Sequence, residues 1–280
     1  MEVAERIRAA GNDLTTAERK VAEAILARPQ AVGFGTVADL ASAAGAGAAT
    51  VVRLAGKLGF GGYTDLQASV QRDLLHQLRP AADRIRDEIG DGTMARHLAA
   101  ELGNVQATLD NVDGDSLTVL VARLSDLAIP VVVLSGHASD GVARQFADEL
   151  GLLRPDVTRL AGNEVAVRRD VSLLPQSTTV VAIDVRRYDR WVLDTVAQAH
   201  SRRMWIAALT DSYLSPIAAN ADRTFVLSAG SLGPFDSHVG TLALLNLVVT
   251  EVAGRLRSSA TGRLDKVEDA WRAAGSLTES

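Results

Sequence analysis

Residues 36–58 read TVADLASAAGAGAATVVRLAGKL and contain two short helical patterns separated by glycines. Thr36 and Asp39 have the spacing of a capping box, and apolar side chains then recur at 37, 40, 41 and 44. The tripeptide Gly45-Ala46-Gly47 ends this pattern, and a second one runs from Ala48 to about Leu58. Two short helices separated by three residues are typical of a helix-turn-helix motif.

The second helix, Ala48 to Leu58, is predicted to have two different faces. With about 100° between successive residues, one face carries Ala48, Val51, Val52, Leu54, Ala55 and Leu58. The other carries small and cationic residues, which suit entry into a DNA major groove: Ala49, Thr50, Arg53, Gly56 and Lys57. The alternative is a solvated face on an ordinary three-helix bundle. The tight turn and the preceding helix favour DNA binding.

A further helix precedes this motif. Thr15 and Glu18 again have capping-box spacing, Val21 and Ile25 are expected to face inward, and Pro29 prevents the helix from continuing. Residues 1–79 are therefore predicted to form an all-α helix-turn-helix DNA-binding domain.

Composition limits the possible functions. The 280 residues are 47% hydrophobic and include no cysteine, which predicts a globular chain without disulfides or thiol chemistry. The formal charge of −5 provides no overall basic field, so any contact with nucleic acid must be local. No run approaches the roughly 18 apolar residues of a membrane span, and the first 28 residues lack the apolar core of a secretion signal. We expect a cytoplasmic protein that has no membrane partner.

The rest of the chain alternates between apolar strands and helical patterns, as in a parallel sheet of βαβ units. The five predicted strands are 129–134, 157–160, 180–185, 205–209 and 225–227, with a helix over 142–153. The predicted fold class is thus α plus α/β, an N-terminal helical bundle followed by a five-stranded parallel sheet. We expect a helical connector over 80–112, an α/β domain over 113–258 and a polar tail over 259–280, with a short helix at 265–274.

Ligands of such sheets bind beyond the carboxyl ends of the strands. The first strand is followed by Ser135-Gly136-His137-Ala138-Ser139, in which Ser139 either caps the next helix or contacts an anion. Asp236 and Ser237 precede the last long helix, where a cap is the expected role and a place in the pocket is the alternative. The P-loop and dinucleotide glycine motifs are absent. No metal site or cofactor is expected.

The quoted segments resemble a known family. LTTAER (14–19), VADLA (37–41) and ATVVRLAGKLGF (49–60) resemble the N-terminal domain of MurR/RpiR transcriptional regulators, and residues 115–257 resemble the sugar isomerase (SIS) domain, notably at 135–139 and 210–222. The resemblance implies that Ala48 to Leu58 is the recognition helix, with Ala49, Thr50, Arg53 and Lys57 as DNA-facing residues. It also implies that the SIS domain binds a phosphorylated sugar, with Ser139 as a phosphate contact, and that this ligand alters DNA affinity.

Two departures from the family pattern stand out. Gly47 replaces the usual serine before the recognition helix, which weakens the cap by only a few tenths of a kcal/mol. The second ligand loop reads Asp184-Val-Arg-Arg-Tyr-Asp189 in place of Ser-x-Ser-Gly-x-Thr. Arginine forks bind phosphate or carboxylate, so the effector is expected to be a phosphosugar or another anionic sugar metabolite. The predicted ligand-binding residues are Ser135, Gly136, His137, Ser139, Arg186, Arg187 and Ser237.

Alternatives remain at this site. Arg186 and Arg187 can instead pair with Asp184, Asp189 or a neighbouring chain and close the pocket. The SIS fold also serves sugar-phosphate isomerases, in which case the helical domain would mediate assembly and not bind DNA. Such an enzyme needs a base, and only His137 and His238 lie near the predicted loops. We expect no catalytic residues.

The helix over Val239 to Leu256 is apolar on nearly every side, which predicts burial in the core or between subunits. Helix-turn-helix proteins usually read two half-sites as symmetric dimers. We therefore expect a homodimer or homotetramer, with this helix near the interface and double-stranded operator DNA as the partner.

Overall fold

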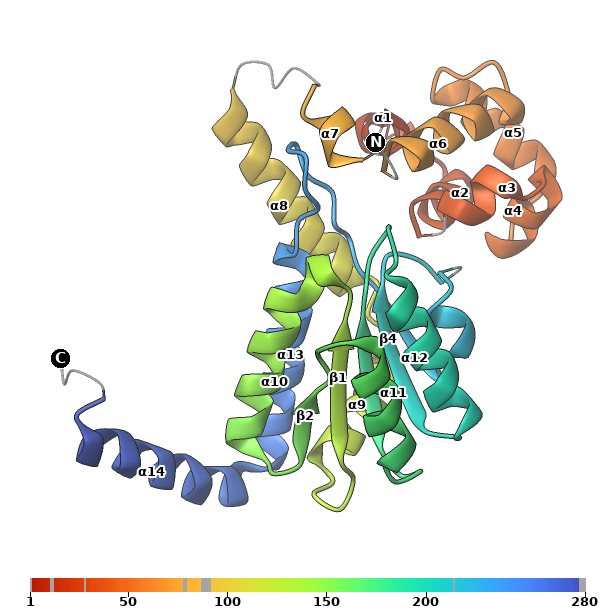
Figure 1. The fold of residues 1–280 in the computed structure, drawn as a ribbon. Helices are drawn as coiled ribbons and strands as arrows, with labels where there is room; N and C mark the ends of the chain where they lie inside the picture. The colour runs from red at the N-terminus through yellow and green to blue at the C-terminus, as the bar shows by residue number, and fades with distance from the viewer. Residues whose placement is uncertain are drawn as a thin grey trace. The chain divides into compact units, whose positions relative to one another are not determined.

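The computed structural model describes residues 2–10, 13–27, 29–77, 80–86, 92–213 and 215–276. It contains two compact units, Met1–Glu88 and Ile89–Ser280 (Figure 1). In these ranges no single helix is long and apolar enough to cross a membrane. Two helix pairs, bent by 100° and 104°, meet that criterion only when their halves are taken together.

The first unit is entirely helical. Its helices are α1 (Glu2–Ala10), α2 (Thr16–Ala27), α3 (Pro29–Phe34), α4 (Val37–Ala43), α5 (Ala48–Lys57), α6 (Tyr63–Gln77) and α7 (Ala81–Arg84). A single apolar cluster holds α1 to α6 together, with Val21, Leu40, Val51, Leu54 and Leu66 among its buried members. The predicted helix-turn-helix is confirmed as α4, a turn through Gly45 at φ 58°, and α5.

Both predicted capping boxes are present. The Thr15 backbone N–H donates to Glu18 Oε2 over 2.9 Å, and the Glu18 N–H donates to Thr15 Oγ1 over 3.3 Å. Thr36 and Asp39 make the same reciprocal pair at the start of α4. These boxes bond backbone donors that lack a partner inside the helix and so fix where α2 and α4 begin.

The second unit is built on a five-stranded parallel sheet of order β2-β1-β3-β4-β5, as predicted. Its strands are β1 (Val131–Ser135), β2 (Val157–Arg159), β3 (Thr179–Ile183), β4 (Trp205–Thr210) and β5 (Arg223–Val226). Its helices are α8 (Thr93–Asp110), α9 (Gly114–Ser125), α10 (Asp140–Leu153), α11 (Glu164–Leu173), α12 (Arg190–Ser201), α13 (Val239–Arg255) and α14 (Arg257–Ala274), with short 3₁₀ turns η2 (His137–Ser139) and η3 (Ala218–Asn220).

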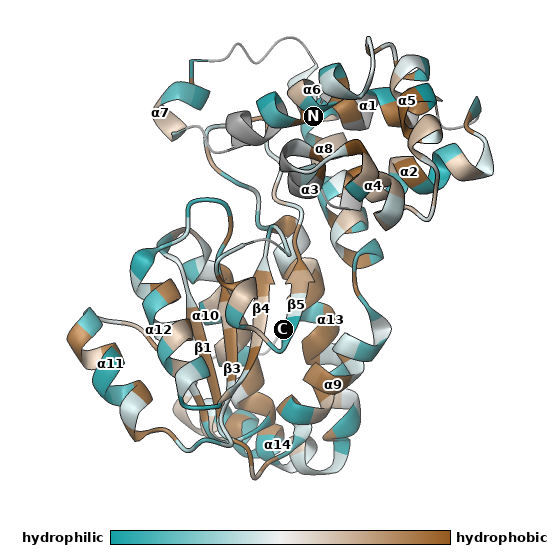
Figure 2. Cartoon of the chain, turned by 90° about the vertical axis from the view of Figure 1, so that its right-hand side faces the viewer, coloured by the Kyte–Doolittle hydropathy of each residue, from teal (hydrophilic) through white to brown (hydrophobic). Residues whose placement is uncertain are grey.

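Helices cover both faces of this sheet. Alternate strand residues such as Val133 and Val181 pack with α9, α10 and α13, whereas Val132 and Val180 pack with α11 and α12. Figure 2 shows the resulting concentration of apolar residues in the strands and in α13. Burial from both sides explains why these strands are continuous apolar runs.

Three helices of the second unit add to the sequence-based expectation or differ from it. Helix α8, in the segment expected to be a connector that begins the second domain, packs along α13 within the second unit. Helix α14 runs from Arg257 to Ala274, well beyond the short helix expected at 265–274. Helix α13, which was expected to be buried in the core or between subunits, exposes Asn246 and Thr250 in the single chain. Its buried face is narrower: Gly240, Thr241, Leu244, Leu245, Val248 and Val252.

Candidate functional site

Helix α5 is the candidate DNA-reading element of the first unit. It begins after Gly47, whose backbone is extended and which has no side chain to cap the helix. Buried Val51, Leu54 and Ala55 pack it against α2, α4 and α6. Ala49, Arg53, Gly56 and Lys57 are exposed, as predicted. The helix therefore presents small residues together with two cations, Arg53 and Lys57.

Three residues of α5 were predicted on the wrong face. Thr50 is only 8% exposed, because a residue four positions before buried Leu54 shares its face. Val52 is 48% exposed and Ala48 is exposed, although both were expected to point inward. The open face is thus rotated relative to the prediction, away from Thr50 and toward Val52.

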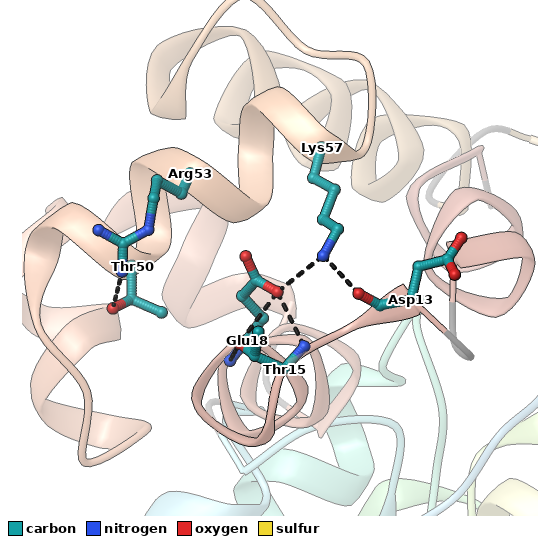
Figure 3. Close-up of polar contacts among 6 residues, drawn as sticks. All are labelled: Asp13, Thr15, Glu18, Thr50, Arg53 and Lys57. Carbon is teal, nitrogen blue, oxygen red and sulfur yellow. Dashed lines mark hydrogen bonds and ion pairs between the residues drawn. The ribbon is translucent and has the colours of Figure 1, made fainter.

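The two cations of α5 have different surroundings (Figure 3). Arg53 Nη2 donates to Thr50 Oγ1 over 3.0 Å, so the buried hydroxyl orients an exposed guanidinium. Lys57 Nζ donates to the carbonyl of Asp13 and, over 3.0 Å, to Glu18 Oε2. The Thr15 backbone N–H and then Lys57 lower the pKa of Glu18 to about 2. Lys57 thus joins α5 to the start of α2.

The second candidate site lies at the carboxyl ends of the strands, where Gly136 meets Asp184. A Cβ on Gly136 would lie 2.2 Å from Asp184 Oδ1, so only glycine fits there. The carboxylate accepts the N–H groups of Val185 at 3.0 Å and Asp189 at 2.8 Å. Burial nevertheless raises the pKa of Asp184 to about 7, and the charges of Asp189 and Asp211 act in the same direction.

Aspartates join the loop 184–189 to its neighbours. Asp189 Oδ2 accepts the His137 N–H over 2.7 Å, which ties the loop after β3 to the loop after β1. Asp211 Oδ1 accepts the Arg186 N–H over 3.0 Å and the Tyr188 hydroxyl over 2.7 Å, which ties it to the loop after β4. Burial, followed by the charge of Asp211, raises the pKa of Tyr188.

Arg186 and Arg187 do not act as a pair. Arg186 has a left-handed backbone, with φ 62°, and its buried guanidinium forms an ion pair with Asp236. Arg187 is exposed. The alternative of a closing ion pair therefore holds for Arg186, although its partner comes from the loop before α13 and is neither Asp184 nor Asp189.

Ser139 and His238 each bury a polar atom that has no partner among the described residues. Ser139 is fully buried at the N-cap position of α10, but its hydroxyl makes no capping bond. The cap role considered from sequence is therefore wrong. Burial lowers the pKa of His238, whose ring contacts the backbone of Ala138. The loop after β1 thus carries the unpaired Ser139 hydroxyl, and the His238 ring with its unpaired nitrogen contacts the same loop.

Ser237 is buried and points elsewhere than expected. Its hydroxyl donates to Glu101 of α8 and accepts the Val239 N–H over 3.2 Å, so it supports the start of α13 without being its N-cap. Aspartates thus contact Gly136, His137 and Arg186, whereas Arg187 is exposed. Ser135 ends β1 directly before Gly136, and Ser139 ends the 3₁₀ turn that begins at His137. The sequence did not predict that Asp189, Asp211 and Glu101 accept hydrogen bonds from neighbouring loops. Aspartates just beyond strand ends were the available signal for the first two.

No group of three or more His, Asp or Glu side chains in the described ranges is arranged to hold a metal ion. The polar groups at this edge of the sheet are hydroxyls, the Arg186 guanidinium, backbone N–H groups and the carboxylates of Asp184, Asp189, Asp211 and Asp236. The hydroxyls, the guanidinium and the N–H groups can bind an anion that competes with Asp236 and Asp189.

Comparison with known families and sequences identifies both units. Residues 1–77 match the family model described as the helix-turn-helix domain of the rpiR family, and residues 131–251 match that of the SIS domain. An uncharacterized HTH-type transcriptional regulator of Haemophilus influenzae is 24% identical over 84% of this chain and 84% of its own length. The HTH-type transcriptional regulator HexR of Pseudomonas aeruginosa is 29% identical over 46% of this chain and 43% of its own.

Two solved structures are also similar. The sugar isomerase domain of an RpiR transcription factor from Sphaerobacter thermophilus is 26% identical, with a TM-score of 0.60 over 63% of this chain and 98% of that domain. The Vibrio vulnificus NanR protein, complexed with ManNAc-6P, is 21% identical, with a TM-score of 0.58 over 97% of this chain and 98% of its own. The second likeness shows a shared fold.

Proposed function

Because this chain belongs to the rpiR family of helix-turn-helix transcriptional regulators with a SIS domain, we propose that α5 binds double-stranded operator DNA under the control of a small anionic sugar metabolite. The observation that carries the proposal is the exposed face of α5 in a chain that also holds a SIS sheet. Small Ala49 and Gly56 permit close approach to a groove, and Arg53 supplies a fork for a base or phosphate.

The roles of the other α5 residues follow from their contacts. Thr50 acts through Arg53, whose guanidinium it holds. Lys57 contacts DNA only by exchanging Glu18 for a phosphate, since both groups are anionic partners for its ammonium. Arg53 is therefore the principal specificity residue in this proposal.

The effector is a phosphosugar or a sugar acid that binds at Ser139 and Arg186. The Ser139 hydroxyl is buried without a partner in the described chain, and the Arg186 guanidinium is held by an aspartate that an incoming anion can replace. The NanR structure, which shares this fold, holds ManNAc-6P. A sugar phosphate is accordingly the first ligand to test.

A thermal-shift series tests this site. Glucose 6-phosphate, N-acetylmannosamine 6-phosphate and gluconate are titrated into the full chain and into Arg186→Ala and Ser139→Ala, with exposed Arg187→Ala as the matched control. We expect at least one ligand to raise the Tm of the full chain and of the control, and to lose its effect in the other two variants. A Tm unchanged by all ligands would contradict an anion site of this class.

We further propose binding without turnover, in the cytoplasm. The relatives named above are transcriptional regulators. Conversion of glucose 6-phosphate to the ketose by the purified chain, with no DNA binding at low salt, would instead support the isomerase alternative.

The chain is proposed to act as a homodimer or homotetramer. Helix α13 has partly exposed apolar residues, and α8 beside it exposes Met94 by 87%, Leu98 by 58% and Leu102 by 61%. Apolar residues on adjoining helices suit an isologous contact between two copies. Light scattering during gel filtration measures the assembly, and a monomer at micromolar concentration would contradict it.

A further inference from the structure

Three polar side chains on α8, which we call the α8 clasp, hold the loop 228–238 that connects β5 to α13. Thr108 Oγ1 accepts the Ser228 N–H over 2.9 Å. Asn104 Oδ1 accepts the Ser228 hydroxyl and the Gly230 N–H, both over 3.0 Å, and its Nδ2 donates to the Gly230 carbonyl over 2.7 Å. The Glu101 carboxylate accepts the Ser237 hydroxyl at the other end of the loop.

The clasp differs from ordinary helix packing. Asn104 is 4% exposed and Thr108 is fully buried, on the face of α8 that meets α13. Burying such groups is unfavourable unless each is hydrogen-bonded, and apolar side chains would pack two helices without that requirement. Here the buried polar atoms bond specifically to a loop more than 100 residues away in sequence. They therefore fix the position of that loop against α8.

The atoms of α8 and the loop 228–238 are also closely packed around Gly240 of α13. A Cβ on Gly240, in the first turn of α13, would lie 2.5 Å from Thr108 Oγ1, 2.8 Å from the Asn104 carbonyl and 3.0 Å from the Ser228 carbonyl. Helix α8, the loop and α13 thus meet at one closely packed point. A displacement of the loop is transmitted to α8, because close-packed groups shift between discrete arrangements and do not compress.

The loop leads from the clasp to the effector site. Asp236, next to Ser237, pairs with Arg186, the guanidinium that the proposed effector would take over. Helix α8 is the first described helix after residues 87–91, which continue the chain from the DNA-binding unit. Both ends of the loop are therefore bonded to α8, and the end at Asp236 and Ser237 is bonded to the proposed ligand site as well.

We propose that the α8 clasp couples the effector site to the DNA-binding unit. This inference rests on the proposed function. An anion that draws Arg186 away from Asp236 removes the partner of Asp236 on the effector side, so this end of the loop is then held through Ser237 and Glu101. Glu101, Asn104 and Thr108 carry the resulting shift into α8. These three are positioning residues in this proposal: they belong neither to α5 nor to the proposed Ser139 and Arg186 site, and they determine how the occupied and empty states differ at α8.

The test compares Thr108→Val, which keeps the shape but removes the hydroxyl, with Thr108→Ser, which keeps the hydroxyl. Gln106→Ala, on the exposed side of α8, is the control. Two quantities are measured on the full chain without effector: amide hydrogen exchange over 228–238, and the Kd for a genomic DNA fragment selected by binding to the unaltered chain. We expect Thr108→Val to exchange faster and to change the Kd at least about fivefold, the lower range of allosteric coupling. The other two variants should match the unaltered chain.

Other outcomes decide against the inference. If Thr108→Val exchanges faster but binds DNA with the same Kd as Thr108→Ser, the clasp only stabilises the loop. If Thr108→Val does not fold, Glu101→Ala, which releases only the Ser237 end, replaces it with the same expectation. Failure of the proposed function is distinguishable, because then the unaltered chain selects no DNA fragment, and the inference falls with it.

Discussion

At the scale of single residues, Gly136 has no room for a side chain at the proposed effector site. In Gly136→Ala the new Cβ would lie 2.2 Å from Oδ1 and 2.4 Å from Cγ of buried Asp184. We expect the free energy of unfolding to fall by about 1–3 kcal/mol, as for other overpacked interiors. Urea denaturation measures it, with Gly141→Ala as the control, since no atom lies within 4 Å of that Cβ. Equal stability of the two variants would refute the packing argument.

Asp184 predicts a pH dependence of stability. Its pKa is about 7 in the folded chain and roughly 3.9 in an unfolded one. Between these values the folded state holds a proton that the unfolded state has lost, so this contribution to stability is full below about pH 4 and is lost as pH rises through 7. The free energy of unfolding should fall from pH 5 to pH 8, and fall less in Asp184→Asn. If the free energy of unfolding depends on pH equally in Asp184→Asn and in the unaltered chain, Asp184 is not the source of that dependence.

The sequence predicted the loop from Ser135 to Ser139 because it follows a buried strand directly. It did not predict the rotation of α5, since Thr50 lies at the border between faces and its burial depends on the helices around it. Nor did it predict the partner of Arg186. Asp236 is 50 residues away in sequence, and only the sheet order brings the two loops together.

At the scale of elements, α5 carries the prediction that Arg53 contacts DNA. Arg53→Ala should weaken specific binding by about 1–3 kcal/mol if the guanidinium pairs with a base, or weaken binding to all sequences alike if it contacts phosphate. Arg72→Ala removes the same charge from an exposed position on α6 and serves as the control. Gel-shift titrations measure both variants. Operator affinity unchanged by Arg53→Ala would remove this side chain from the interface.

The sequence predicts helices and strands best where the spacing of apolar residues is regular and the ends are marked by capping residues or glycines. All five strands and the helix-turn-helix follow from continuous apolar runs, capping boxes and glycines. Helix α8 was identified as helical, but its inward face was not, because Asn104 and Thr108 are polar residues that are buried only through their bonds to a distant loop. Pattern alone assigns such residues to solvent.

At the scale of the whole molecule, the chain joins a helix-turn-helix unit, whose α5 is proposed to bind DNA, to a SIS unit that is proposed to bind an anion. The two units have separate apolar cores, so each can keep its fold while the linkage between them changes. Regulation then requires only that the effector favour one arrangement of α8 over another.

The most direct test is a fluorescence-anisotropy titration of the full chain against DNA fragments from around its own gene, at low and moderate salt, with and without sugar phosphates, sugar acids and cell-extract metabolites. The account predicts salt-sensitive binding that prefers some fragments, with a Kd that one of these metabolites changes at least about fivefold. Absence of binding to every fragment at low salt, with and without the metabolites, would contradict it.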